Sequence, residues 1–165
     1  MTNLNIFGDR CIYKKGNNQY FKLAEMHTEY RVRNIYQKEY ITYSIDGGII
    51  PQNTNTTKCD FLLITQDTTD THKGIFIELK GKNVEHALEQ IDSTLRQLGS
   101  VITDYYKQRS LNYRYYGRVI ARKGVSQANC SARHKQLFEN LKRRLKKEFH
   151  GDMLKIEKSG FEESI

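Results

Sequence analysis

Tryptophan is absent from this sequence of 165 residues, and proline occurs only once, as Pro51. The scarcity of proline and the moderate apolar content exclude a disordered or fibrous chain and are typical of a soluble folded domain. Cysteine is also scarce. The three cysteines, Cys11, Cys59 and Cys130, are odd in number and have no spacing that suits a metal site. We therefore expect free thiols in a reduced, cytoplasmic protein, and no zinc.

Long apolar runs are missing as well. None approaches the roughly 20 residues of a membrane-spanning helix, so no membrane partner is expected. The opening residues, MTNLNIFGDRC, lack the basic flank and the apolar stretch of a secretory signal. The length is enough for one domain with a real core and too short for two ordinary ones, so we predict a single domain over residues 1–165.

Acidic residues are sparse in the second half of the chain. The formal net charge is +8, and residues 106–150 hold 13 Lys and Arg against 2 Asp and Glu. This asymmetry favours a polyanionic partner, most simply a nucleic acid. A solvated basic helix would give the same composition, so charge alone leaves both interpretations open.

Strand patterns dominate the first half of the chain. Residues through KKGNNQ look loop-rich, with short strands expected at most around Asn5 and Tyr20. The span 30–50, rich in Tyr, Ile, Val and Thr, predicts one or two strands that end at a DGG turn signal. The runs CDFLLI (59–64) and GIFIEL (74–79) predict two strands joined by a polar loop, which together form a hairpin.

The second half changes to a helical period. Apolar residues at steps of three and four over 84–105 predict a long helix with Asn83 as its N-cap. A strand is expected at about 115–122, then a helix over about 131–149 with one basic face, and then a short strand at MLKIE. The order of elements predicts an α/β fold with a mixed central sheet flanked by α-helices.

Two acids and an amine stand at the ends of the two most strand-like segments. Because side chains alternate along a strand, Glu78 and Lys80 project from the same face. If the hairpin pairs Ile64 with Gly74, Asp60 lies opposite Glu78, and cross-strand Cβ atoms are about 5 Å apart. The sequence therefore predicts two adjacent carboxylates with an amine beside them.

Such a pair has a chemical use. Carboxylates this close repel and raise each other's pKa, and a hard divalent cation removes the repulsion. Mg²⁺ takes a few carboxylate oxygens together with water and substrate phosphate, and an amine can hold an attacking water. Each residue alone would more simply be a solvated strand end, but Glu78 in an apolar run is expensive without a partner. The arrangement predicts phosphodiester hydrolysis.

The order Asp60, a hairpin, Glu78-Leu79-Lys80 and then a helix resembles the PD-(D/E)XK nuclease superfamily. The resemblance covers about residues 40–122 and implies a restriction-endonuclease-like fold. It also implies that Asp60, Glu78 and the carbonyl of Leu79 bind Mg²⁺ or Mn²⁺, and that Lys80 activates the water. Cys59 stands where the family name has proline.

Other expectations follow from the same resemblance. The helix after the motif would supply a polar residue, for which Gln90 is the candidate, with His86 one turn earlier. Asp46 would be an additional acid near the metal. DNA is expected rather than RNA, and a small domain of this kind would form a homodimer to reach both strands.

Basic residues suggest where a nucleic acid would bind. Tyrosines interleave with arginines over 105–118, a pattern that suits base stacking and phosphate contact, although several of the tyrosines must also be core. The basic face of 133–147 would contact phosphates without reading sequence. The predicted contacts are Arg109, Arg114, Arg118, Lys142, Arg143 and Lys146.

Three alternatives stay open at this stage. The chain could be a catalytically silent nucleic-acid-binding subunit of a larger complex, or a protein-interaction module with an acidic partner. His27 and Glu29 could join the metal site, as comparable residues do in some relatives, or be ordinary exposed polar residues.

Overall fold

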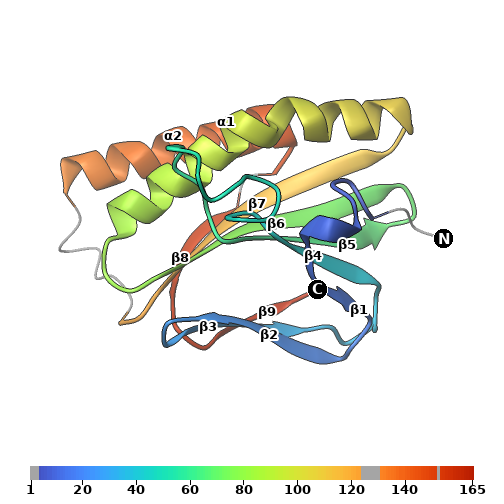
Figure 1. Cartoon of the computed structure of the whole chain (residues 1–165), viewed down its shortest axis with the longest axis horizontal. Coiled ribbons are helices and arrows are strands. Elements are labelled where there is room, and N and C mark those ends of the chain that lie inside the picture. Colours follow the sequence, from blue (N-terminus) through green and yellow to red (C-terminus); the bar gives the residue numbers. More distant parts are fainter. Residues whose placement is uncertain (1–3, 124–130, 152) are drawn as a thin grey trace.

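The computed structural model describes residues 4–123, 131–151 and 153–165. A six-stranded mixed sheet has both helices on one face and a three-stranded sheet on the other (Figure 1). The helices are α1 (Val84–Gln108) and α2 (Ala132–Phe149), with a short 3-10 turn, η1 (Asp9–Cys11). The strands are β1 (Ile12–Gly16), β2 (Tyr20–Glu25), β3 (Thr28–Arg33), β4 (Tyr40–Ser44), β5 (Phe61–Thr68), β6 (Thr71–Lys80), β7 (Asn112–Ala121), β8 (Leu154–Lys158) and β9 (Phe161–Ser164).

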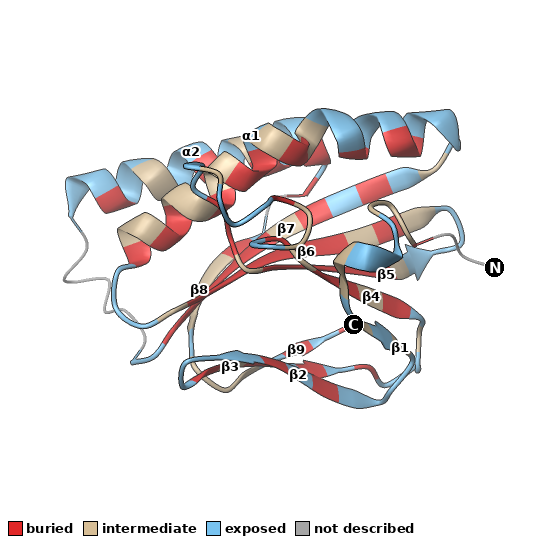
Figure 2. Ribbon diagram, viewed as in Figure 1, coloured by how far each residue is buried: buried red, intermediate tan, exposed pale blue. Residues whose placement is uncertain are grey.

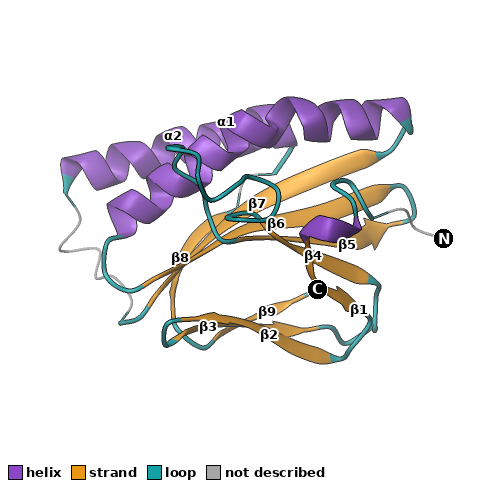
Figure 3. Cartoon of the chain, in the orientation of Figure 1, coloured by secondary structure: helices purple, strands orange, loops and turns teal. Residues whose placement is uncertain are grey.

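The two sheets differ in topology. The large sheet has the order β1-β4-β5-β6-β7-β8, antiparallel from β1 to β6 and parallel from β6 to β8. The small sheet has the order β2-β3-β9, in which the last strand of the chain runs parallel to β3 (Figure 3). The carboxyl ends of β6, β7 and β8 therefore meet at one edge of the large sheet, where α1 begins.

Both helices begin at the predicted caps. The side chain of Asn83 accepts a hydrogen bond from the backbone N–H of His86, and Ser131 accepts one from His134. These bonds satisfy amide groups that the first turn of a helix leaves without partners. The predicted helices and their first residues are thereby confirmed, and α1 extends three residues beyond the predicted end.

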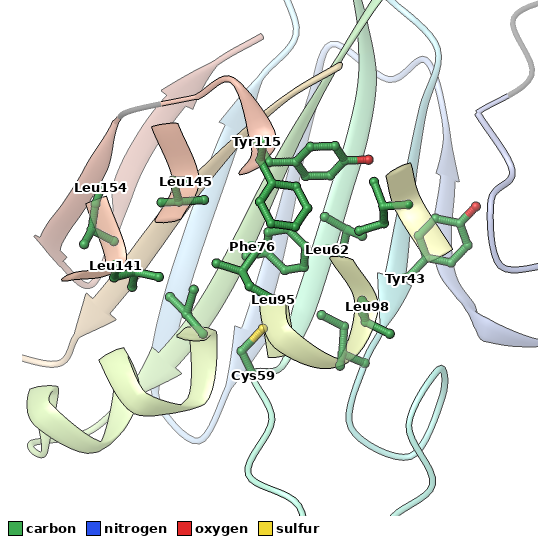
Figure 4. Close-up of a cluster of buried hydrophobic side chains, with 14 of the residues drawn as sticks. Tyr43, Cys59, Leu62, Phe76, Leu95, Leu98, Tyr115, Leu141, Leu145 and Leu154 are labelled. Carbon is green, nitrogen blue, oxygen red and sulfur yellow. The ribbon is translucent and has the colours of Figure 1, made fainter. Parts of the chain in front are cut away.

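The core lies on both faces of the large sheet (Figure 2). Phe76 packs toward the helices with Leu62, Leu95 and Tyr115, as the close-up shows (Figure 4). Its neighbours Ile75 and Ile77 belong to the second cluster, under the small sheet. A strand covered on both faces is apolar without alternation, which explains the continuous run GIFIEL.

The mixed α/β class is confirmed, but the layers differ from the prediction in one respect. Helices flank only one face of the sheet, because the β2–β3 hairpin and β9 cover the other. The sequence did not predict β1, whose Lys14 and Lys15 make it look like a loop, or the short β9. Among the described residues no helix is long and apolar enough to cross a membrane. Cys11 and Cys59 are free thiols, and Cys130 lies outside the described residues.

Candidate functional site

The β5–β6 hairpin has the predicted register. Ile64 pairs with Gly74, and the pairing continues to Phe61 opposite Ile77. The next residues, Asp60 and Glu78, then fall opposite each other just beyond the last pair of the ladder. The sequence-derived geometry of the two acids is therefore confirmed at the level of register.

Side chains take over the hydrogen bonds where this ladder ends. The backbone N–H of Leu79 donates to Oδ2 of Asp60 at 2.8 Å, and the N–H of Asp60 donates to Oε2 of Glu78 at 3.1 Å. Each carboxylate thus replaces a strand carbonyl and is held by the backbone of the facing strand. This reciprocal arrangement fixes both side chains next to each other.

Lys80 completes the predicted trio. Its Nζ lies 3.9 Å from Oε1 of Glu78, and its side chain is 30% exposed whereas that of Glu78 is 2% exposed. Asp60 has intermediate burial. Glu78 therefore forms the floor of the site, and Lys80 stands at its solvent side.

The two acids have strongly perturbed titration. Burial raises the pKa of Asp60 to about 7, with the Leu79 N–H opposing and the charge of Glu25 adding to the effect. Burial, and then the charge of Asp60, raise the pKa of Glu78 to about 9, while Lys80 acts in the opposite direction. A buried carboxylate and a partly buried one, with a single partly exposed amine, lack positive charge, so they hold protons or need a cation.

Glu25 is the residue that sequence analysis missed. It is the last residue of β2, and the two-residue turn Met26-His27 links it to Thr28, its partner at the start of β3. Its carboxylate interacts with Asp60 and raises the pKa of both site acids. The small sheet brings it there from a distance of 35 residues in the sequence, so no local motif marks it.

The turn beside Glu25 has an unusual backbone. Met26 and His27 have φ angles of 40° and 71°, which is the left-handed region. Two-residue hairpin turns require such angles and usually take Asn-Gly, because larger side chains are strained there. Met26 is also 86% exposed at this tip. Of the two residues the sequence offered here, His27 is in the turn, whereas Glu29 forms ion pairs with Lys22 at 2.8 Å and Arg31 at 3.2 Å.

Gln90 reaches the segment that leads into Asp60. Its Nε2 donates to the carbonyl of Lys58 at 2.9 Å. Its Oε1 is buried and has no hydrogen-bond partner among the described residues, which leaves one strong acceptor available. His86 is directed elsewhere, with Nδ1 3.6 Å from Glu89.

Asp46 forms a different contact from the one expected. Its Oδ1 lies 3.4 Å from Nζ of Lys58, a side chain that is only 6% exposed and also donates to the carbonyl of Pro51 at 2.9 Å. Asp46 is thus the counter-ion of a buried amine. The third carboxylate that acts on Asp60 and Glu78 is Glu25, and a metal-binding role for Asp46 has no contact in its favour.

The donor set limits which metal the site fits. Within residues 4–123, 131–151 and 153–165, no group of three or more His, Cys, Asp or Glu is arranged to hold a metal ion. A structural zinc or calcium site would need more protein ligands. Mg²⁺ is commonly bound through one or two carboxylates, with water and substrate phosphate as the other ligands. The carboxylates of Asp60 and Glu78 fit such an ion arriving with substrate, and the carbonyl of Leu79 remains a ligand expected from the resemblance alone.

Arg118 corrects one predicted nucleic-acid contact. Its side chain is 1% exposed and lies between the sheets, where Nε donates to Glu163 at 2.7 Å and Nη2 donates at 2.9 Å. Nη1 donates to the carbonyls of Gly117 and Met153. The sequence could not show that β9 returns over β7 and supplies the carboxylate. Arg118 therefore links the two sheets through Glu163 and is too deeply buried to contact a nucleic acid.

The aromatic part of the predicted binding surface is also core. Tyr106, Tyr113 and Tyr115 are buried, and the rings of Tyr106 and Tyr113 stack with centroids 4.9 Å apart. They are not available to stack on bases. Arg109 is exposed but lies over the ring of Tyr105, 3.8 Å from its centroid, and Arg114 is exposed.

The basic face of α2 is partly used inside the molecule. Arg144 donates to Asp92 of α1 at 2.7 Å, and Arg133 pairs with Glu89 of the same helix. These contacts attach α2 to α1 and reduce the positive charge left for a partner. Of the predicted phosphate contacts, Lys142 lies 3.8 Å from Glu139, Arg143 donates to Asn140, and Lys146 is exposed.

Comparison with known proteins adds no relative. No family model, curated protein or solved structure matches the chain. The function therefore has to be inferred from the chemistry of the site itself.

Proposed function

We propose that this chain is a metal-dependent nuclease that hydrolyses phosphodiester bonds, with a restriction-endonuclease-like arrangement of its site. One observation carries the proposal. Asp60 and Glu78 are fixed next to each other by reciprocal backbone hydrogen bonds, with Nζ of Lys80 3.9 Å from Glu78. Buried acids of like charge are costly, and such pairs concentrate at functional sites.

Each residue has a distinct role in the proposal. Asp60 and Glu78 would hold Mg²⁺ or Mn²⁺, and the bound ion would supply Lewis-acid stabilisation of the phosphoryl oxygens. Lys80, whose Nζ carries hydrogen-bond donors, orients the attacking water beside Glu78. Glu25 adds negative charge next to Asp60 and increases the attraction of the site for a cation.

The polymer and the assembly are proposed on weaker grounds. DNA rather than RNA, and a homodimer that reaches both strands, rest on the resemblance of the motif to the PD-(D/E)XK superfamily. The net charge of +8 supports a nucleic acid of either kind.

A second candidate function has its own observation. The bonds from Leu79 and Asp60 give the two carboxylates a structural use that needs no metal. A subunit that binds nucleic acid without cutting it would keep these bonds and the positive charge. The positive charge of the chain would likewise be enough to attract an acidic protein partner.

One assay separates these functions. Plasmid DNA, single-stranded DNA and RNA are incubated with the protein in Mg²⁺, Mn²⁺ or EDTA. Metal-dependent cleavage that Glu78→Gln and Lys80→Met abolish supports the nuclease. The matched control is Asp67→Asn, an exposed acid at the far end of β5, which should leave cleavage unchanged.

The other results of this assay point to the alternative functions. Salt-sensitive binding without cleavage in either metal identifies a silent binding subunit. The absence of any binding at low salt identifies a protein-interaction module.

A further inference from the structure

A second site lies at the carboxyl ends of β6 and β7. A cavity of about 300 Å³ is lined there by Gly81, Lys82, Ala121, Arg122 and Lys123. Three of these five residues are cations, and none of the five is an acid. The parallel pairing of Lys80 with Ala121 brings the two segments together.

These cations have no counter-ion among the residues that the structure describes. Lys82, Arg122 and Lys123 are exposed, and their side chains form no ion pair or hydrogen bond with the rest of the described chain. By contrast, α2 directs Arg133 and Arg144 to acids on α1. Glu85, in the first turn of α1, is directed toward α2, where it accepts a hydrogen bond from the N-cap residue Ser131.

The backbone around the cavity is well defined. The N–H of Arg122 donates to the carbonyls of Lys80 and Gly81, at 3.1 and 3.3 Å, which ties the end of β7 to the end of β6. Gly81 has no side chain to narrow the cavity, and no other atom lies within 4 Å of the place where a Cβ would be. The wall therefore leaves room for a bulky anion among the three cations.

We propose that this cavity binds a backbone phosphate of the nucleic acid, within a few nucleotides of the phosphate that is cut. The inference rests on the proposed function for its substrate. Lys82 lies four residues after Glu78, so the two residues are at most about 13 Å apart at roughly 3.3 Å per residue. One strand can therefore pass from the acid pair into the cavity. Lysine and arginine contacts of this kind fix the register of a nucleic acid without reading its sequence.

The test measures binding in the absence of catalysis. A labelled DNA duplex and an RNA duplex of the same sequence are titrated with protein in EDTA, between about 50 and 200 mM KCl. The variant Lys82→Gln/Arg122→Gln/Lys123→Gln should weaken binding at least tenfold and reduce the slope of log Kd against log[KCl] by about 1 or more. The arm that shows the loss identifies the polymer.

A control of equal charge makes the result specific. Arg10→Gln/Lys15→Gln/Arg33→Gln removes three exposed cations that lie outside the cavity and outside the predicted nucleic-acid contacts. A clearly smaller effect of this control supports the cavity as the phosphate site. Equal losses in both variants, or no loss in the cavity variant, overturn the inference. Circular dichroism of the variants checks that each is folded.

Failure of this inference and failure of the proposed function give different results. If the cavity variant loses binding but the unmodified chain cuts nothing in Mg²⁺ or Mn²⁺, the phosphate site stands and the nuclease does not. If the unmodified chain cuts and the cavity variant binds as before, the nuclease stands and the phosphate site does not.

Discussion

Two buried carboxylates of this molecule have opposite surroundings. Glu163, on β9, is 7% exposed and receives two hydrogen bonds from Arg118 across the layers. Glu78, on β6, is 2% exposed and has Asp60 as its neighbour, with Lys80 only at 3.9 Å. Burial alone would raise the pKa of both. Arg118 brings the pKa of Glu163 below its ordinary value, whereas burial and Asp60 raise that of Glu78 to about 9.

The difference separates a carboxylate with a complete internal partner from one without. The Arg118–Glu163 pair is complete in itself and joins β7 to β9. The Asp60–Glu78 pair is incomplete, because its negative charge exceeds what Lys80 neutralises. Such a deficit persists in a folded protein where a ligand or a proton supplies the missing charge. The comparison predicts that mutations of the first pair change stability and that mutations of the second change activity.

The largest effect is expected from Glu78→Gln. This change keeps the shape of the side chain but removes the charge that would hold the metal ion. Cleavage of plasmid DNA should fall by about a thousandfold, the upper end of the loss seen when a stabilising polar group is removed. Initial rates at saturating Mg²⁺ measure it. A thermal midpoint equal to or above that of the unmodified chain would show that the loss is not one of folding.

Removing one partner of the Arg118–Glu163 pair should instead lower the stability of the protein. Arg118→Met leaves Glu163 buried without a partner, which typically lowers the free energy of unfolding by about 3–5 kcal/mol. Urea denaturation measures the change. Adding Glu163→Gln to the Arg118→Met chain should recover part of the lost stability. If Arg118→Met alone is as stable as the unmodified chain, the Arg118–Glu163 pair does not stabilise the fold.

The pH dependence of stability should have opposite signs in the two regions. Without metal, Asp60 and Glu78 keep protons that they lose in the unfolded state, where carboxyls titrate near ~4. Their raised pKa values, about 7 and about 9, make the native state less stable as pH rises through this window. The lowered pKa of Glu163 acts in the other direction, since its contribution is lost as pH falls.

Thermal melts over this pH range in EDTA test the sign. Glu78→Gln should flatten the decline at alkaline pH. Mg²⁺ should raise the melting temperature more at about pH 8.5 than at about pH 6, because Asp60 has then lost its proton and fewer protons compete with the metal. If Mg²⁺ raises the melting temperature equally at both pH values, the metal does not bind to Asp60 and Glu78.

The smallest effect concerns the turn that carries Glu25. Replacing Met26 and His27 by Asn and Gly suits the positive φ angles of this turn and should stabilise the protein by about 1 kcal/mol. Urea denaturation measures the gain. If the strain serves the site, the rate of cleavage should fall at the same time. An unchanged rate would show that the turn only carries Glu25.

The sequence was sufficient for whatever depends on local period and neighbouring strands. Asn83 and Ser131 cap the helices as predicted, and the two-residue period of the β5–β6 hairpin placed Asp60 opposite Glu78. These features follow from short-range geometry. The restriction-endonuclease-like topology and the nuclease activity remain predictions from the same residues.

The errors arose where distant segments meet. Arg118 looked like an exposed arginine among tyrosines, because nothing near it in the sequence shows that β9 covers that face of β7. Glu25 went unnoticed for the same reason, since the small sheet brings it to Asp60. Asp46 was expected near the metal from the family resemblance, and the structure places it 3.4 Å from the amine of Lys58.

A crystal structure of the chain soaked in Mn²⁺ tests the central claim most directly. The account predicts an anomalous peak that lies at coordination distance, about 2.1 Å, from carboxylate oxygens of both Asp60 and Glu78. The peak should be lost in Glu78→Gln. An anomalous map with no peak between the two acids, while Leu79 and Asp60 keep their hydrogen bonds to them, would contradict it.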